Sequence, residues 1–157
     1  MNILVRKAEM HDYDDVERIM KQVHRLHVSL RPDIYRDADP VISPVSYSQR
    51  LENSVWWVAE CDHTVRGFME LYRRRYTSNA QMPRETLFIA TIAVDEPYRS
   101  QGIGHALLEK AAELRDAANM DSIELQVSAR NTAALHMYES FGFTPESINM
   151  ELRKEEE

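Results

Sequence analysis

A glycine-containing turn in the middle of the chain has the residue types and spacing of an anion-binding site. Arg99, Gly102 and Gly104 form the pattern Arg-x-x-Gly-x-Gly between an apolar run and a segment with helical periodicity. The first turn of a helix has N–H groups without intrahelical partners, and the helix dipole makes that end positive. Glycines let the backbone approach a diphosphate closely. The pattern therefore predicts a phosphate cradle; the alternative is an ordinary strand-to-helix turn with Gly102 at the helix start.

The elements on both sides of this turn follow from the apolar residues. Residues 87–94 carry no charge and include several β-branched side chains, which predicts a strand buried on both faces. Pro97 ends this strand, because proline lacks the N–H that a central ladder needs. Apolar residues then recur at positions 103, 107, 108, 111 and 114, which form one stripe of a helix.

Two segments together resemble the GNAT acyl-CoA-dependent N-acyltransferases. The turn is similar to that family's Arg/Gln-x-x-Gly-x-Gly/Ala motif. A second motif is matched by the run from Leu125 to Asn131 followed by Ala134, Tyr138, Gly142 and Phe143. Each motif alone is weak, since short glycine patterns occur by chance, but their order and spacing agree. The resemblance covers residues 87–143, about half of the chain.

The resemblance implies the GNAT fold, which is mixed α/β (α+β) with a central, mostly antiparallel sheet of six to seven strands flanked by helices. We expect residues 1–157 to form a single GNAT acetyltransferase domain. Periodicity indicates further strands at 2–7, 55–61, 65–75, 122–127 and 148–152. It also indicates a first helix that ends near residue 30, and helices at 46–51 and 131–140, with a loop at 78–84.

The resemblance also implies acetyl-CoA as cosubstrate. Backbone N–H groups of the turn would hold the diphosphate, and Arg99 would add a charge-assisted contact. In GNAT proteins the central strand bulges and splays, so that its backbone faces the pantetheine arm and one N–H stabilises the oxyanion. The alternative is a fully paired core strand. The residues expected to bind the cofactor are Ile92, Ala93, Val94, Arg99, Ser100, Gln101, Gly102, Ile103, Gly104, His105 and Asn131.

Tyr138 is the expected general acid. It lies seven residues after Asn131, two helical turns, so that both side chains share one face of the predicted helix. In GNAT enzymes the tyrosine at this position commonly protonates the departing CoA thiolate, and the asparagine contacts the cofactor arm. The alternatives are a core aromatic residue for Tyr138 and a helix N-cap for Asn131.

The resemblance does not supply the general base. Histone-type members have a glutamate where this chain has Phe88, and ribosomal-protein N-terminal acetyltransferases have one where it has Gln126. The remaining candidates are Glu70, Glu85 and Glu124, although charged strand residues most often face solvent. We rank Glu70 first. A base acting through water, or an amine that arrives neutral, are the alternatives.

The resemblance implies an amine acceptor, which we expect to be a small molecule or a peptide. A net charge of -7 argues against a nucleic-acid partner and favours cationic molecules. No apolar run reaches the roughly 20 residues of a membrane span. Cys61 is the single cysteine, which is typical of a reducing compartment, so we expect a cytoplasmic protein. The resemblance places the acceptor near residues 26–47, with His27, Arg31, Tyr35 and Arg36, and near Trp56 and Tyr72.

We therefore predict an acyl-CoA-dependent N-acetyltransferase that moves an acetyl group from acetyl-CoA to a primary amine by direct attack. Cys61 lies outside both motifs, so an acyl-enzyme has no support. His24 and His27 lack a third ligand, so no metal is expected. A homodimer is expected because family members are often dimers. The alternative function is a non-catalytic acyl-CoA-binding regulatory domain, which the missing carboxylates at 88 and 126 favour.

Overall fold

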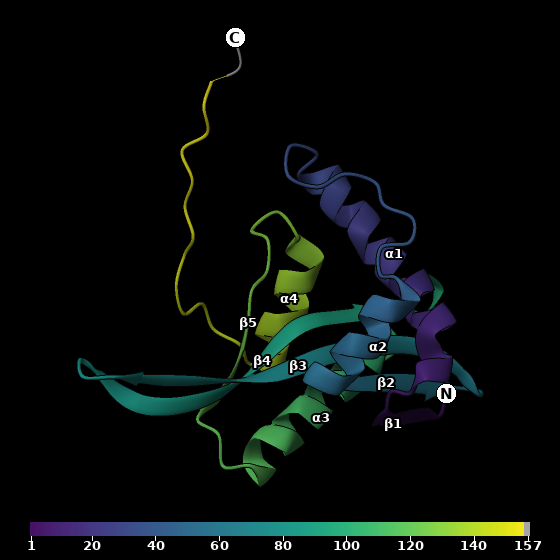
Figure 1. The fold of residues 1–157 in the computed structure, drawn as a ribbon, viewed down its shortest axis with the longest axis horizontal. Helices are drawn as coiled ribbons and strands as arrows, with labels where there is room; N and C mark the ends of the chain where they lie inside the picture. Colours follow the sequence, from purple (N-terminus) through teal and green to yellow (C-terminus); the bar gives the residue numbers. More distant parts are fainter. Residues whose placement is uncertain (156–157) are drawn as a thin grey trace. The chain divides into compact units, whose positions relative to one another are not determined.

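The computed structural model describes residues 1–155, which divide into two compact units, one from Met1 to Gln126 and one that begins at Val127 (Figure 1). The first unit contains a sheet in the order β1-β2-β3-β4-β5. Its strands are β1 (Ile3–Lys7), β2 (Val55–Cys61), β3 (Thr64–Ser78), β4 (Gln81–Val94) and β5 (Ser122–Leu125). Neighbouring strands are antiparallel except β4 and β5, which are parallel. The expected mixed α/β class with a mostly antiparallel sheet is confirmed.

Helices cover both faces of this sheet. The helices of the first unit are α1 (Tyr13–Leu30), α2 (Pro44–Asn53) and α3 (Ile103–Ala117). The buried stripe of α1, with Val16 and Ile19, packs in one core cluster with Phe68 of β3. The neighbouring residue, Gly67, points to the opposite face, because side chains alternate along a strand. There a Cβ atom would lie 2.8 Å from Ile103 of α3, so α1 and α3 lie on opposite faces.

The expected loop at residues 78–84 is wrong. β3 and β4 continue to Ser78 and Gln81, and the turn between them is residues 79–80. The hairpin reaches well beyond the helices of the first unit (Figure 1). Its outer part is held by contacts across strands: the Arg84 guanidinium lies 4.2 Å from the centre of the Tyr76 ring and donates to Glu124 of β5. The loop was predicted from polar composition, which does not reveal these contacts between strands.

The expected strand at 148–152 is also wrong, so the described part of the chain has five strands rather than six or seven. Ile148, Met150 and Leu152 are 80%, 90% and 101% exposed. Alternating apolar residues indicate a strand, but a strand also needs a partner for its backbone groups. No strand partner pairs with this segment among residues 1–155.

The second unit contains α4 (Thr132–Phe141). Asn131 begins the helix as its N-cap, where its side-chain oxygen accepts a hydrogen bond from the Ala134 N–H at 3.2 Å. Gly142 ends it with a φ of 121°, a left-handed conformation that glycine adopts without strain. The rings of Tyr138 and Phe143 lie 5.7 Å apart in an edge-on arrangement.

Candidate functional site

The turn that precedes α3, which is the predicted phosphate cradle, contains two residues in the left-handed backbone region. Ser100 and Gly102 both have positive φ values, 62° and 91°. Gly102 is the N-cap of α3 and provides no side-chain cap. The first backbone bond of the helix runs from the Ala106 N–H to the Gly102 carbonyl at 3.0 Å. The N–H groups of Ile103 and Gly104 therefore have no intrahelical acceptor and are available to a phosphate.

Arg99 extends along the same turn. Its Nε donates to the Val94 carbonyl at 3.3 Å, which ties the start of the cradle to the end of β4. A guanidinium has five N–H donors, so this bond leaves others for an anion. The side chain is exposed, as a phosphate ligand at the rim of a cradle would need to be.

The central strand β4 is both bulged and partly unpaired. The register changes between Glu70 opposite Thr91 and Leu71 opposite Ile89, so that Ala90 is an extra residue on β4. On the other side, pairing with β5 ends at Ile89, although β4 continues to Val94. Residues 91–94 therefore pair with β3 but leave their other edge without a strand partner among the described residues.

Glu70 lies next to this bulge and is held by three donors. Its carboxylate is 5% exposed. Arg50 donates two hydrogen bonds to it, one from Nε at 3.1 Å and one from Nη2, and Ser54 Oγ donates a third at 2.7 Å. Trp56 Nε1 in turn donates to Ser54 Oγ at 3.0 Å. The residues of this cluster come from α2, its C-cap, β2 and β3.

The two other candidate bases, Glu85 on β4 and Glu124 on β5, are engaged in ion pairs. Glu85 contacts Arg73 at 3.3 Å and Arg75 at 3.6 Å. Glu124 on β5 accepts from Arg84 at 3.0 Å and is opposite Phe88 in register. Glu85 and Phe88, the residue opposite Glu124, both precede the bulge along β4, whereas Glu70 is opposite Thr91 beside it.

Tyr138 and Asn131 belong to the second unit. Tyr138 is 9% exposed, and burial raises the pKa of its phenol to about 12. The hydroxyl therefore keeps its proton at neutral pH, which is the state that a proton donor needs. Asn131 uses its side-chain oxygen as the N-cap of α4 and has its amide N–H groups left to donate.

The region expected to contact the acceptor contains an aromatic group. The rings of His27 and Tyr35 lie 5.0 Å apart, and burial lowers the pKa of His27. Arg31 forms an ion pair with Asp33 at 2.7 Å. Trp56 is 3% exposed and belongs to the core, whereas Tyr72 is 36% exposed on β3.

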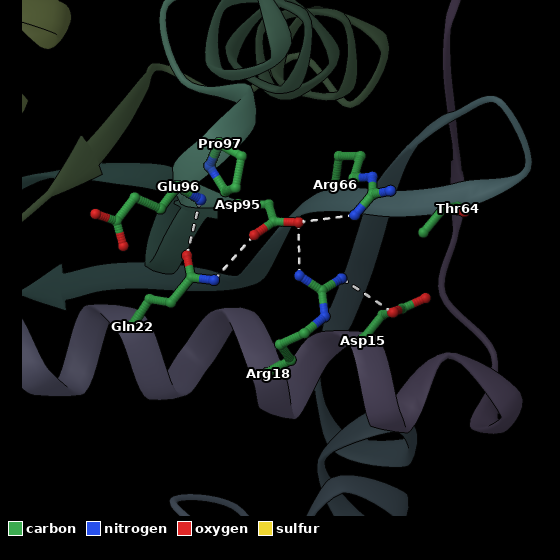
Figure 2. Close-up of a pocket in the computed structure, with 8 residues that line it drawn as sticks. All are labelled: Asp15, Arg18, Gln22, Thr64, Arg66, Asp95, Glu96 and Pro97. Carbon is green, nitrogen blue, oxygen red and sulfur yellow. Dashed lines mark hydrogen bonds and ion pairs between the residues drawn. The ribbon is translucent and has the colours of Figure 1, made fainter.

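A buried carboxylate that the sequence analysis missed joins α1 to the turn after β4. Asp95 is 1% exposed and accepts hydrogen bonds from Arg18 at 2.5 Å, Gln22 at 2.9 Å and Arg66 at 3.0 Å (Figure 2). Gln22 also accepts the Glu96 N–H at 2.8 Å. Burial raises the pKa of Asp95, but the three donors outweigh burial and hold that pKa below its usual value. This network fixes the start of the turn that leads into the cradle.

A shallow pocket of about 720 Å³ lies beside this network. Figure 2 shows Arg18 and Arg66 both turned toward Asp95, with Pro97 next to them. The Arg66 guanidinium also lies 4.1 Å from the centre of the Tyr98 ring. Both oxygens of the Asp95 carboxylate accept hydrogen bonds within this cluster, whereas Arg66 Nε is buried without a partner among the described residues. We assign the cluster a structural role. The sequence signal for this cluster is the position of Asp95, a carboxylate directly after an apolar strand.

Two further results concern the described residues. None of their helices is long and apolar enough to cross a membrane. No group of three or more His, Cys, Asp or Glu side chains among them is arranged to hold a metal ion.

The chain is similar in sequence to known N-acetyltransferases. A ribosomal protein bS18 alanine N-acetyltransferase of Escherichia coli is 43% identical over 63 residues, which are 40% of this chain and 41% of that protein. The match thus spans about two fifths of that relative's length. An N-alpha-acetyltransferase of Sulfurisphaera tokodaii is 29% identical over 143 residues, 88% of this chain and 78% of that protein.

Solved structures share the fold over nearly the whole chain. A mutant of the BH1408 protein of Bacillus halodurans superposes with a TM-score of 0.93 at 28% identity, covering 96% of this chain and 99% of that one. The aminoglycoside N-acetyltransferase AAC(6')-Iy in complex with CoA has a TM-score of 0.71 at 15% identity, with 97% and 99% covered, which shows the fold alone. The model of the acetyltransferase (GNAT) family matches residues 20–143, and the chain belongs to that family, whose cosubstrate is acetyl-CoA.

Proposed function

We propose that this protein transfers the acetyl group of acetyl-CoA to a primary amine of a small molecule or peptide by direct attack. The proposal rests on one observation, that one edge of β4 lacks a strand partner near its end among residues 1–155. Pairing with β5 ends at Ile89 while β4 continues to Val94, and one short 3-10 helix, Glu96–Tyr98, separates the strand from the turn at Gly102. An extended cofactor arm can lie along the unpaired edge with its diphosphate at the N-terminus of α3.

The cofactor-binding residues proposed from this arrangement fall in two groups. The backbone of Ile92, Ala93 and Val94 would contact the arm, and one of their N–H groups would stabilise the oxyanion. The turn from Arg99 to His105 would hold the diphosphate, chiefly through backbone N–H groups. Asn131 would contact the arm through its amide N–H groups, since its oxygen caps α4.

The proposed reaction moves two protons. The amine nitrogen attacks the thioester carbonyl, a C–N bond forms, and the C–S bond breaks. The amine proton passes to Glu70, directly or through water, and Tyr138 donates its proton to the departing thiolate. The raised pKa of Tyr138, about 12, keeps that proton in place until the thiolate forms.

Glu70 retains the capacity for its proposed role as base despite its partners. An ionised carboxylate offers about four lone-pair sites. Two accept from Arg50 and one from Ser54, so one remains for the amine proton.

Calorimetric titration with acetyl-CoA, followed by thiol release against a panel of primary amines, tests the proposal. Binding with amine-dependent thiol release is expected. The Glu70→Gln variant should retain acetyl-CoA binding and lose about 100-fold in kcat. Gln126→Ala, which removes a side chain at a family base position where this chain has no carboxylate, serves as the matched control. Binding without release would favour a regulatory acyl-CoA-binding domain instead.

A further inference from the structure

One face of the β3–β4 hairpin carries a row of aromatic and arginine side chains. Side chains of β3 alternate between faces, so Tyr72, Arg74 and Tyr76 share the face of Glu70. Register places Tyr72 opposite Phe88, Arg74 opposite Thr86, and Tyr76 opposite Arg84. We call the set Tyr72, Arg74, Tyr76, Arg84, Phe88 and Glu124 the aromatic–arginine face.

The charges of this face are paired except at one position. Arg84 and the Tyr76 hydroxyl both donate to Glu124, at 3.0 Å and 3.1 Å. Farther along the same face, Arg50 is paired with Glu70. Arg74 has no carboxylate partner among residues 1–155. It is therefore a locally uncompensated cation on a chain whose net charge is -7.

The guanidinium of Arg74 is held in a defined orientation. Its Cζ lies 3.5 Å from the centre of the Phe88 ring and 5.5 Å from that of Tyr72. Its Nη2 donates to the Tyr72 hydroxyl at 3.1 Å. Because that hydroxyl oxygen accepts from Arg74, its own proton is left to donate. An arginine fork stacked on an aromatic ring, beside a hydroxyl donor, is suited to a carboxylate or phosphate.

We propose that Arg74 and Tyr72 form a subsite for an anionic group of the acceptor, so that the preferred substrates are primary amines that also carry a carboxylate or phosphate. The inference rests on the proposed function, because it places the amine beside Glu70 and the bulge at Ala90. Phe88, over which Arg74 lies, precedes Ala90 by two residues, and two strand residues span about 7 Å. The amine and the anion of the acceptor should therefore be separated by about that distance.

The net charge of the chain and this subsite would act on opposite ends of the acceptor. A negative protein attracts the ammonium of the acceptor over long range. Arg74 would then orient the bound molecule by its anionic end, which directs the amine toward the thioester. An ω-amino acid and an acidic residue near the amino end of a peptide both offer an amine with a carboxylate several bonds away, so the test includes both.

The test uses acceptors matched in shape but different in charge. One pair is 6-aminohexanoate and 6-aminohexanamide, and the other is the tripeptide amide Ala-Asp-Ala with its Asn counterpart. We expect kcat/KM to be about tenfold higher for the anionic member of at least one pair. In Arg74→Gln that ratio should fall to near one. Arg75→Gln removes the same charge from the opposite face, where the side chain is 71% exposed, and should retain the ratio.

Calorimetric binding of the same compounds to the CoA-loaded protein gives a readout that does not require turnover. Binding that prefers the anion and depends on Arg74, without thiol release, would support the subsite and contradict the transferase. Turnover of both members without an Arg74-dependent preference would support the transferase and overturn the subsite. Absence of an Arg74-dependent preference from both measurements overturns the subsite as well. Thermal unfolding of each variant establishes that it is folded.

Discussion

Tyr138 combines a buried hydroxyl with a raised pKa. Burial raises the pKa of the phenol to about 12, so the proton stays on the oxygen throughout the usual assay range. Tyr138→Phe should lower kcat by about 100-fold, since it removes only the proton donor. Acetyl-CoA affinity should change little, because the ring remains. Steady-state kinetics and calorimetry measure the two quantities separately; equal kcat in the variant would exclude the role as acid.

Cys61 allows a test of direct transfer. Its side chain is 2% exposed, and burial raises the pKa of the thiol, which disfavours the reactive thiolate. Cys61→Ala should keep kcat within about twofold, because no acyl-enzyme is proposed. Mass spectrometry after mixing wild-type protein with acetyl-CoA should detect no acetylated Cys61. A covalent adduct at Cys61 together with an inactive variant would require a different mechanism.

Gly67 is required at the element scale, where β3 approaches α3. A Cβ atom would lie 2.8 Å from Ile103 Cγ2 and 3.1 Å from the Ala93 carbonyl oxygen. Gly67→Ala should therefore reduce the free energy of unfolding by about 1–3 kcal/mol, as overpacked cores do. Because Ile103 begins α3, acetyl-CoA affinity should fall too. Urea unfolding and calorimetry check both effects.

Gly102 offers a contrast, since a Cβ there would make only an ordinary van der Waals contact. The nearest atom is Ile3 Cδ1 at 4.0 Å, so the expected cost comes from the positive φ of 91°. Gly102→Ala should cost about 1–2 kcal/mol of stability. If the backbone relaxes to avoid that strain, the cradle changes shape and acetyl-CoA binds more weakly. A stable variant with unchanged affinity would contradict the proposed cradle.

Local pattern accounts for the elements that the sequence predicts well. The apolar run before Pro97 and the helical stripe after Gly102 both lie within a few residues of the turn that they define. The hairpin was underestimated because its outer strands depend on partners across the sheet, such as Glu124 for Arg84, which lie 40 residues apart. Composition in a short window does not contain those partners.

Acid should weaken the whole molecule through its buried carboxylates. Burial raises the pKa of Asp95 from its ordinary 3.8, but hydrogen bonds from Gln22, Arg18 and Arg66 lower it further than burial raises it. A lowered pKa in the folded state gives stability that is present above the unfolded pKa and is lost as pH falls through the folded one. Asp12, whose net pKa is also lowered, acts in the same direction.

We therefore expect the free energy of unfolding to fall as pH drops below about 4. Asp95→Asn should be less stable at neutral pH by about 2–3 kcal/mol, near the low end for a broken buried ion pair because Arg18 is partly exposed. Its stability should also depend less on pH in the acid range. Urea unfolding at several pH values measures both; parallel pH profiles for the two proteins would contradict this account.

The site as a whole was predicted unevenly for the same reason. The cradle and Tyr138 stand in motifs that are contiguous in sequence, so type and spacing identified them as candidates. The Arg50 and Ser54 partners of Glu70 lie 20 and 16 residues away from it, on α2 and at its C-cap. The contacts of Asp95 span 77 residues to Arg18. A single sequence carries no local signal for such distant contacts.

The one-sided pairing of residues 91–94 has a consequence for amide hydrogen exchange. Along an edge strand, successive N–H groups point alternately toward the neighbouring strand and away from it. In the ligand-free protein every second amide of this stretch should therefore exchange with solvent deuterium much faster than its neighbours, which β3 protects. A cofactor arm that occupies the edge would slow the exposed set and leave the other unchanged. Mass spectrometry of deuterium uptake at single residues, with and without cofactor, would then show protection in the pattern that a neighbouring strand gives.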